Sequence, residues 1–105
     1  MEKIILKRKK RKKRKMRAHQ IVESMNQVDF TGLKCPMIVI YQKPYDFPNA
    51  FIARVWEGIG PVATNTMIIR NSLHEIREDI VAAGFTIKLP RSRRDDPVVV
   101  ETWMR

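Results

Sequence analysis

The hydrophobic pattern in the last two-thirds of the chain predicts three strands in succession. Residues 37–41 form a short apolar, β-branched run, which is typical of a buried strand. Residues 51–57 alternate, with an apolar set on one side and Ile52, Arg54 and Trp56 on the other. Residues 66–70 form a third apolar run. Because short turns join these runs, we expect the strands to pair antiparallel.

A helix is predicted next, over residues 73–83. Ser72 and Glu75 have the spacing of a capping box, in which each residue satisfies an unpaired backbone N–H of the first turn. Gly84 is suited to the left-handed conformation that ends many helices. One apolar stripe at helical spacing faces the expected core: Leu73, Ile76, Ile80 and Ala83.

Two more strands are predicted after the helix, over residues 85–89 and 98–103. The order β-β-β-α-β-β places the protein in the α+β class. We expect a small two-layer sandwich, with a mainly antiparallel sheet and one helix on one of its faces. The order of the strands within the sheet does not follow from the sequence.

The first 36 residues differ from the rest in composition. Residues 1–17 hold 11 basic side chains and one acid, so they carry a net charge equal to that of the whole chain, +10. We expect this basic arm to be disordered when free, because like charges repel and nothing apolar offsets the cost of ordering. Residues 18–36 are interpreted as a linker, in which 18–26 can form a short helix, marginal alone. The α+β domain is then expected to span residues 37–105.

The basic arm is a candidate for binding nucleic acid or another polyanion. Lys and Arg neutralise phosphates without reading sequence, and no aromatic ring is interleaved for base stacking. Three other readings stay open: a solubilising arm, contact with anionic lipid, or translation that starts at Met16, Met25 or Met37. The candidate nucleic-acid-binding residues are Lys7, Arg8, Lys9, Lys10, Arg11, Lys12, Lys13, Arg14, Lys15 and Arg17.

The sequence predicts no catalytic residue, no metal site and no cofactor. Asp95, Asp96 and Glu101 are close in sequence, but arginines lie next to them and Asp-Asp-Pro is typical of a turn. The two histidines and Cys35 lack the spacing of a zinc site. A single cysteine excludes an internal disulfide and fits a cytoplasmic protein. No apolar run is long enough to span a membrane.

The aromatic residues are the candidate protein interface. The predicted helix covers only one face of the sheet, so we expect the other face to expose aromatic and arginine side chains, which interfaces enrich. The alternative is that both tryptophans are ordinary core residues. The candidate interface residues are Tyr45, Phe47, Arg54, Trp56 and Trp103.

The stretch from residue 43 to the C-terminus resembles a family of small uncharacterised bacterial and phage-associated proteins. The motifs that carry the likeness are Lys-Pro-x-Asp-x-Pro at 43–48, Ser-Leu-x-Glu-Ile-Arg at 72–77 and Asp-Asp-Pro-Val-Val-Val-Glu-x-Trp at 95–103. The resemblance implies no activity. Residues 37–83 also resemble, in the order of their elements, the partial RNase-H-like domain of HicB-type antitoxins.

Taken together, these patterns predict a non-enzymatic interaction protein. We expect it to bind a protein partner, or itself, through the sheet face or an edge strand. The resemblances imply a phage or mobile-element protein, such as an antitoxin or an inhibitor of a host protein. The alternative is a sequence-independent nucleic-acid-binding protein that acts through its basic arm.

Overall fold

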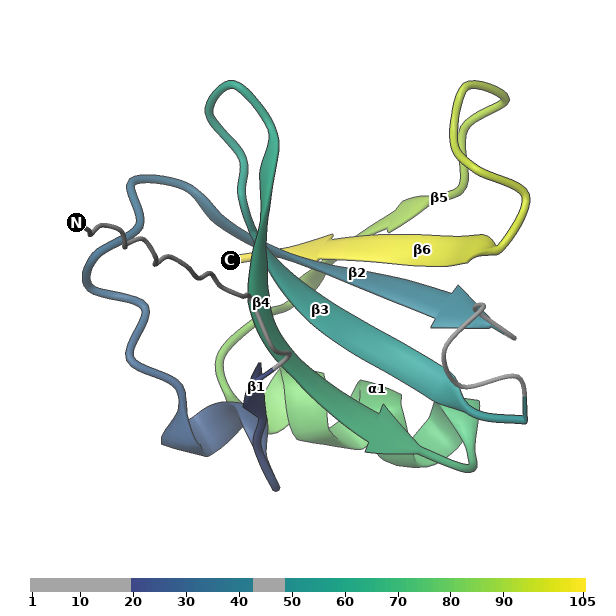
Figure 1. Ribbon diagram of the computed structural model, residues 1–105, viewed down its shortest axis with the longest axis horizontal. Coiled ribbons are helices and arrows are strands. Elements are labelled where there is room, and N and C mark those ends of the chain that lie inside the picture. Colours follow the sequence, from purple (N-terminus) through teal and green to yellow (C-terminus); the bar gives the residue numbers. More distant parts are fainter. Residues whose placement is uncertain (1–19, 43–48) are drawn as a thin grey trace, which may run out of the picture.

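The structure, a computed structural model, describes residues 20–42 and 49–105 and shows one mixed sheet with one α-helix (Figure 1). The α+β class is therefore confirmed. Within the described residues the sheet has six strands in the order β1-β4-β3-β2-β6-β5. The elements are β1 (Gln20–Ile21), a 3₁₀ turn η1 (Met25–Gln27), β2 (Pro36–Gln42), β3 (Phe51–Glu57), β4 (Val62–Arg70), α1 (Leu73–Ala82), β5 (Ile87–Pro90) and β6 (Val99–Met104).

The centre of the sheet is antiparallel, as the short turns predict. Strands β2, β3 and β4 follow one another as neighbours, and β6 returns beside the free edge of β2. Strand β5 pairs with the outer side of β6 and forms one edge of the sheet. The other edge is β1, which pairs parallel with β4 and was not expected from the sequence. The fourth expected strand begins later than predicted, because Phe85 turns into the core instead of extending the strand.

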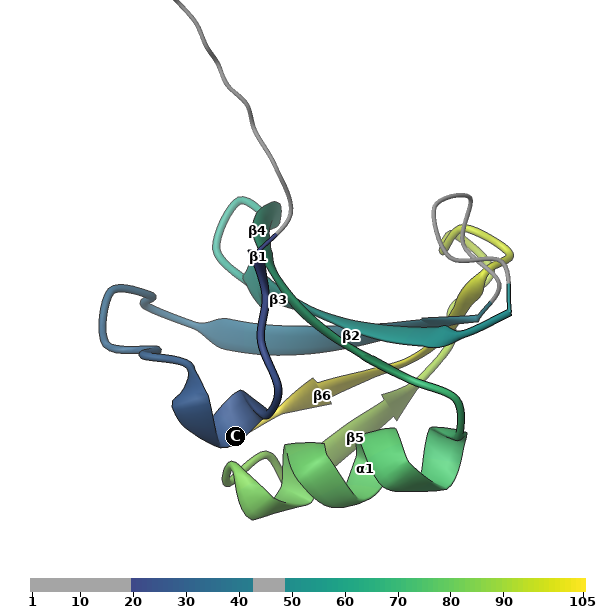
Figure 2. The same ribbon diagram turned by 60° about the horizontal axis from the view of Figure 1, so that its bottom comes forward.

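Helix α1 forms as its sequence predicts and lies across one face of the sheet (Figure 2). Ser72 is the N-cap, and its hydroxyl accepts a hydrogen bond from the Glu75 N–H at 3.4 Å. Gly84 follows the helix with a φ of +96°, in the left-handed region that favours glycine. Ile76 and Ile80 are fully buried against the sheet. They pack in a core with Ile38, Ile40, Ala53, Val55, Ile68, Phe85 and Trp103.

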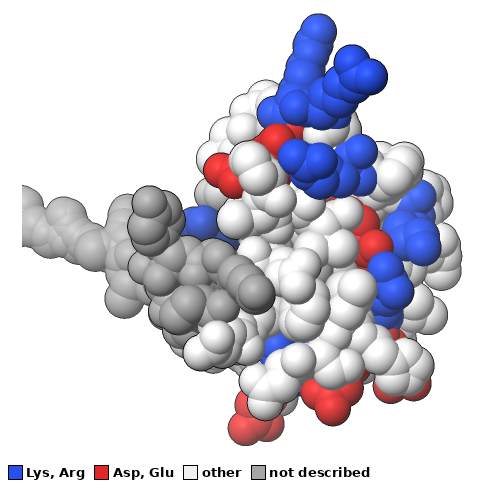
Figure 3. Space-filling model, turned by 90° about the vertical axis from the view of Figure 1, so that its right-hand side faces the viewer, with Lys and Arg blue, Asp and Glu red and all other residues white. Residues whose placement is uncertain are grey.

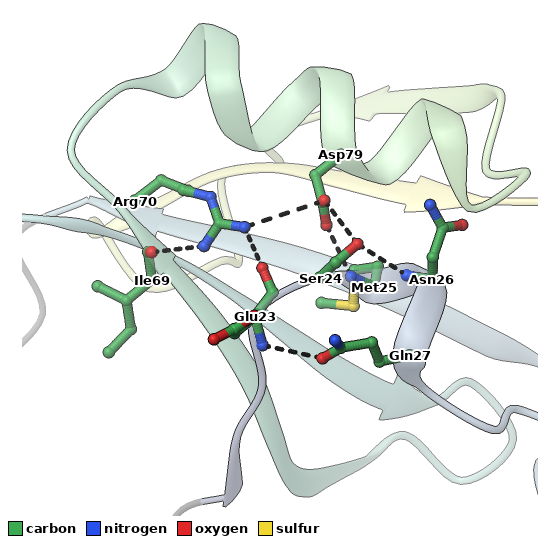
Figure 4. A network of polar contacts seen from close by, with 8 residues as sticks. All are labelled: Glu23, Ser24, Met25, Asn26, Gln27, Ile69, Arg70 and Asp79. Carbon is green, nitrogen blue, oxygen red and sulfur yellow. Dashed lines mark hydrogen bonds and ion pairs between the residues drawn. The ribbon is translucent and has the colours of Figure 1, made fainter.

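The linker expected over residues 18–36 is wrong for its described part, residues 20–36. Met25 is fully buried and Phe30 is 6% exposed, both in the same core as α1. The Asp79 carboxylate of α1 accepts a hydrogen bond from the Met25 N–H at 2.7 Å and one from the Ser24 hydroxyl at 2.9 Å (Figure 4). This segment is therefore part of the domain, whose described structure begins at residue 20. In residues 20–26, the described part of the helix predicted over 18–26, the structure has β1 and the start of the 3₁₀ turn η1 instead.

The shortness of α1 explains why the N-terminal segment packs here. Ten helical residues span about 15 Å, which leaves one end of the sheet core without a helix above it. Phe30 fills that end and meets the ring of Phe85 edge-on, with 5.1 Å between centroids. The Arg105 guanidinium lies over both rings, at 4.7 and 5.0 Å. Residues 20–36 show no regular spacing of apolar residues, because this segment covers the core mostly with turns instead of one long helix or strand.

Candidate functional site

The sheet face opposite α1, here called the open face, is the candidate site. Figure 2 shows that the β3–β4 hairpin and the loop between β5 and β6 both curve away from α1, on the same side of the sheet. Between them lies a groove of about 500 Å³. Its lining comes from three neighbouring strands and the two loops: Met37, Val39, Tyr41, Trp56, Pro61, Arg94, Asp95, Asp96, Val99 and Thr102.

The floor of the groove is apolar because alternate residues of the central strands face it. Met37 of β2 lies opposite Trp56 of β3, and Val39 lies opposite Thr102 of β6. A bulge in β6 places Val99, rather than Val100, opposite Tyr41. Bulges re-aim side chains, and this one brings Val99 onto the open face.

The aromatic end of the groove is a hydrogen-bonded pair. The Trp56 indole Nε1–H donates to the Tyr41 hydroxyl oxygen at 3.1 Å, and both side chains are half-buried. Burial raises the pKa of Tyr41, and this effect exceeds the opposing effects of the Trp56 hydrogen bond and the Arg54 charge. The phenol therefore stays protonated at neutral pH. A protonated phenol can donate a hydrogen bond through its O–H.

One wall of the groove is the β3–β4 hairpin, which side-chain hydrogen bonds fix at two places. The first is the register shift between Arg54 and Trp56, where the Thr64 hydroxyl donates to the Val55 carbonyl at 2.7 Å. Arg54 Nε–H donates to the Thr64 carbonyl at 2.6 Å, which holds the guanidinium against the hairpin. At the base, the Glu57 carboxylate accepts N–H bonds from Lys34, Cys35 and Ile59, at 2.8, 2.9 and 3.2 Å.

The close approach at this base requires glycine at position 58. The Gly58 N–H donates to the Cys35 carbonyl at 2.7 Å. A Cβ at position 58 would lie 2.9 Å from both that oxygen and the Cys35 sulfur. The three backbone hydrogen bonds lower the pKa of Glu57, led by the one from Lys34. The hairpin therefore projects from the sheet in a fixed direction.

The opposite wall is the loop between β5 and β6, which its two aspartates hold together. Asp95 Oδ2 accepts from the Ser92 N–H at 2.7 Å, and Asp96 Oδ1 accepts from the Val98 N–H at 3.1 Å. These are the turn-forming contacts expected of Asp in loops. Arg94 is exposed beside them and lines the groove.

An exposed apolar edge continues the open face beyond the groove. Leu89 of β5 lies opposite Thr102, and Ile87 lies opposite Met104, so both share the open face. Ile87 is 52% exposed and Leu89 is 42% exposed. Strand β5 is the last strand of the sheet in the described part of the chain, so this edge adds accessible apolar area to the groove.

The structure separates the two tryptophans that the sequence placed together. Arg54 and Trp56 lie on the open face, as expected. Trp103 does not: it is 7% exposed and packs beneath α1 in the core. The prediction that Trp103 faces outward is wrong, because β6 turns Trp103 and its alternate neighbour Glu101 toward the helix.

Glu101 is buried beneath α1, where its carboxylate accepts three hydrogen bonds. Arg77 Nε–H and Nη2–H donate to its two oxygens at 2.9 and 2.7 Å, and Trp103 Nε1–H donates at 2.8 Å. Burial raises the pKa of Glu101, but the hydrogen bonds from Arg77 and Trp103 outweigh it, so the pKa lies below its ordinary value. Glu101 thus faces the opposite side of the sheet from Asp95 and Asp96.

The remaining sequence-predicted site residues lie outside the described part of the chain. These are Tyr45 and Phe47, in the segment that follows β2, and the basic residues of the arm, Lys7–Arg17.

Sequence reasoning missed most of the groove lining, including the three residues that β2 contributes, Met37, Val39 and Tyr41. They occupy alternate positions of β2, which the apolar run marked only as buried. The register between β2 and β3 places these three residues on the same face of the sheet as Arg54 and Trp56.

Comparisons with family models, with curated proteins and with solved structures gave no match. Within the described residues, no helix is long and apolar enough to cross a membrane.

Proposed function

We propose that this protein is a non-enzymatic binding protein whose open-face groove receives a segment of a protein partner. The observation that carries the proposal is the groove itself, with an apolar floor on the face that α1 leaves uncovered. Its lining includes Met37, Tyr41, Trp56 and Arg94, the residue types that protein interfaces enrich. The exposed Ile87 and Leu89 extend the apolar area in the same direction.

The state of the acidic groups supports binding rather than catalysis. Hydrogen bonds within the loop engage Asp95 and Asp96, and Glu101 is paired with Arg77 on the other face. A general acid or base works best with a pKa near the operating pH and with access to substrate. The chemistry that the groove offers is instead apolar contact, a phenol O–H and one guanidinium.

An antitoxin or an inhibitor of a host protein is a role that such a surface suits. Both act by covering part of another protein, and both need a preformed apolar face more than a catalytic group. The resemblance of residues 43–105 to phage-associated proteins supports this role, and the single cysteine supports a cytoplasmic setting.

The test is a selection of random 16-residue peptides displayed on yeast against the full chain. We expect the enriched peptides to bind through the groove, so that Met37→Glu lowers their affinity at least tenfold. The matched control is Val81→Glu, which places the same charge on an apolar residue of α1 that is 47% exposed. Thr102→Glu is the second groove variant, in case Met37→Glu fails to fold. Peptides whose binding ignores both groove variants, or the absence of enriched peptides, would refute the proposal.

A second candidate function is sequence-independent binding of nucleic acid by the basic arm. The charge of residues 1–17 favours it, because it equals the net charge of the whole chain. This function does not use the groove, and its salt dependence is predicted in the Discussion.

A further inference from the structure

The two walls of the groove rise at opposite ends of strand β2. Met37, near the start of β2, lies opposite Trp56, and β3 runs into the hairpin just after it. Tyr41, near the end of β2, lies opposite Val99, which follows the β5–β6 loop. Figure 2 shows the hairpin and this loop on the same side of the sheet, with the strands running between them. The groove therefore crosses the strands instead of running along one of them.

The distance between the walls suits an α-helix. Met37 and Tyr41 are four residues apart in β2, which corresponds to about 13 Å at about 3.3 Å per residue. An α-helix with its side chains is about 10–12 Å across, so it would meet the floor and both walls. A single extended chain takes up only about 5 Å in the plane of a sheet and would leave one wall without contact.

The floor is long enough for nearly three turns of such a helix. Strands β3, β2, β6 and β5 are neighbours in that order, so three inter-strand spacings of about 4.8 Å give a path of about 14 Å. At about 1.5 Å per residue, roughly ten helical residues cover this length. The exposed Ile87 and Leu89 of β5 lie at the end of the path and extend the apolar contact.

Addition of a partner strand at the edge of the sheet is disfavoured at β5. This edge strand has four residues, carries the exposed Lys88 and ends at Pro90, which has no backbone N–H to offer. Short length, lysine and proline are features by which natural sheets prevent pairing with another chain. A partner that contacts Ile87 and Leu89 therefore does so through side chains on the open face.

The hairpin wall of the groove is apolar. Trp56 and Pro61 contribute to the groove lining from this side. At the tip of the hairpin, Ile59 is 60% exposed and Val62 is 58% exposed. Exposed apolar side chains that continue an apolar floor are typical of a protein contact surface. An apolar stripe on a bound helix can therefore extend from the floor onto this wall.

The opposite wall is charged, with cations in excess. Figure 3 shows Lys and Arg side chains gathered at the top, over the β5–β6 loop. Hydrogen bonds from the backbone of the loop itself engage Asp95 and Asp96. Among the described residues, no ion pair engages the arginines of this loop. Charge complementarity therefore favours acidic side chains on the part of a partner that faces this wall. The exposed arginines are Arg91, Arg93 and Arg94.

Two other occupants fit the groove less well. A second copy of the chain offers α1 as its one helix in the described residues, and α1 buries its apolar Ile76 and Ile80 against its own sheet. Single-stranded nucleic acid is bound through stacking on aromatic rings. The floor of the groove is instead made of aliphatic side chains, which suit the apolar residues of a protein: Met37, Val39 and Val99.

We infer that the groove binds one amphipathic α-helix of another protein, with its apolar stripe on the floor and the hairpin wall and with Asp or Glu on the side that faces the arginines of the β5–β6 loop. Helices bound in grooves are recognised through apolar side chains at i, i+3, i+4 and i+7. The inference rests on the proposed function and specifies the conformation and the chemistry of the partner segment.

The test uses those peptides from the selection whose binding to the full chain depends on the groove. We expect their apolar residues to repeat at i, i+3, i+4 and i+7, with Asp or Glu along one side. Proline at a central polar position should lower the affinity at least tenfold, because it breaks a helix, and alanine at the same position should not. Far-UV circular dichroism of the complex should show more helix than the sum of free peptide and free protein.

A charge variant tests which side of the helix faces the loop. Arg94→Gln should lower the affinity for an acidic peptide at least threefold at 50 mM salt and by less at 500 mM, because salt screens exposed charges. The matched control is Lys88→Gln, which removes a charge from an exposed side chain of β5. Lys88 lies opposite Trp103 and so belongs to the α1 face of the sheet. This control should leave the affinity unchanged.

Three outcomes would overturn this inference while leaving the proposed function standing. Groove-dependent peptides could tolerate proline at every position, could gain no helix on binding, or could lack Asp and Glu and bind Arg94→Gln unchanged. If instead no enriched peptide depends on the groove, the proposed function fails too. Twelve-nucleotide poly(dT) and poly(U) are added as competitors. Displacement of the peptide by an oligonucleotide whose own binding is lost in Met37→Glu would assign the groove to nucleic acid and overturn both proposals.

Discussion

Replacing Met25 with Ala tests whether the N-terminal segment belongs to the core. The Met25 side chain is fully buried, although it lies 12 residues before the first strand that the sequence predicted. Removing a buried Met side chain costs about 2–5 kcal/mol, from lost transfer free energy and from the cavity that remains. Because α1 and η1 are held together through Asp79, the site has little freedom to collapse, so we expect the upper half of this range.

This loss is large compared with the total stability of such a domain. At about 0.05–0.15 kcal/mol per residue, roughly 85 residues give a free energy of unfolding of about 4–13 kcal/mol. A change of 1 kcal/mol shifts the Tm of a domain of this size by about 4–8 °C. A loss in the upper half of the range, about 3.5 kcal/mol or more, should therefore lower the Tm of Met25→Ala by at least about 14 °C.

The measurement is urea unfolding of the full chain, followed by far-UV circular dichroism and by tryptophan fluorescence. Trp103 reports on the core, because it is buried beneath α1. Asn26→Ala is the matched control: the next residue in η1 is exposed and should change stability by less than about 0.5 kcal/mol. A loss below about 0.5 kcal/mol for Met25→Ala would show that residues 20–36 do not contribute to the core, and the linker interpretation would then be right.

Three further predictions concern the helix cap, the buried ion pair and the arm. Ser72→Ala should cost about 1 kcal/mol in urea unfolding and Ser72→Asp much less, since Asp also caps; equal losses would place the cap elsewhere. Glu101→Gln should cost about 1–3 kcal/mol at pH 7, because it removes a charged acceptor. The pKa of Glu101 is lowered in the folded state, so its contribution is present above its ordinary pKa and is lost as the pH falls through the folded value. The difference from the natural chain should therefore shrink in acid-unfolding curves, and a constant difference from pH 7 to pH 2 would contradict this. Finally, if about eight arm residues contact duplex phosphates, log K should fall against log salt with a slope of about −7. A sequence preference above tenfold, or unchanged binding by a full chain in which residues 7–15 are replaced by Gln, would show that the folded domain reads nucleic acid.

Local sequence patterns determined the elements whose signals are local. The helix was predictable because Ser72, the apolar stripe and Gly84 each act within one or two turns of it. Strand β3 was predicted at its observed bounds, and its alternation placed Arg54 and Trp56 on the face away from the core. These features follow from backbone geometry and side-chain parity, which need no knowledge of distant residues.

Tertiary structure decided the features that depend on pairing between distant segments. The Val-Val-Val run at residues 98–100, where β6 begins, does not show where the bulge falls. The bulge nevertheless brings Val99 to the open face, while Glu101 and Trp103 pack beneath α1. Met25 and Phe30 lie in a segment without apolar period, and only the open end of the short helix layer gives them a place in the core. The groove exists because pairing brings the β3–β4 hairpin and the β5–β6 loop to the same side of the sheet. The alternation of side chains along a strand is a local property. Which face of the sheet is covered depends instead on contacts between residues far apart in the sequence, and those contacts determine where the candidate site lies.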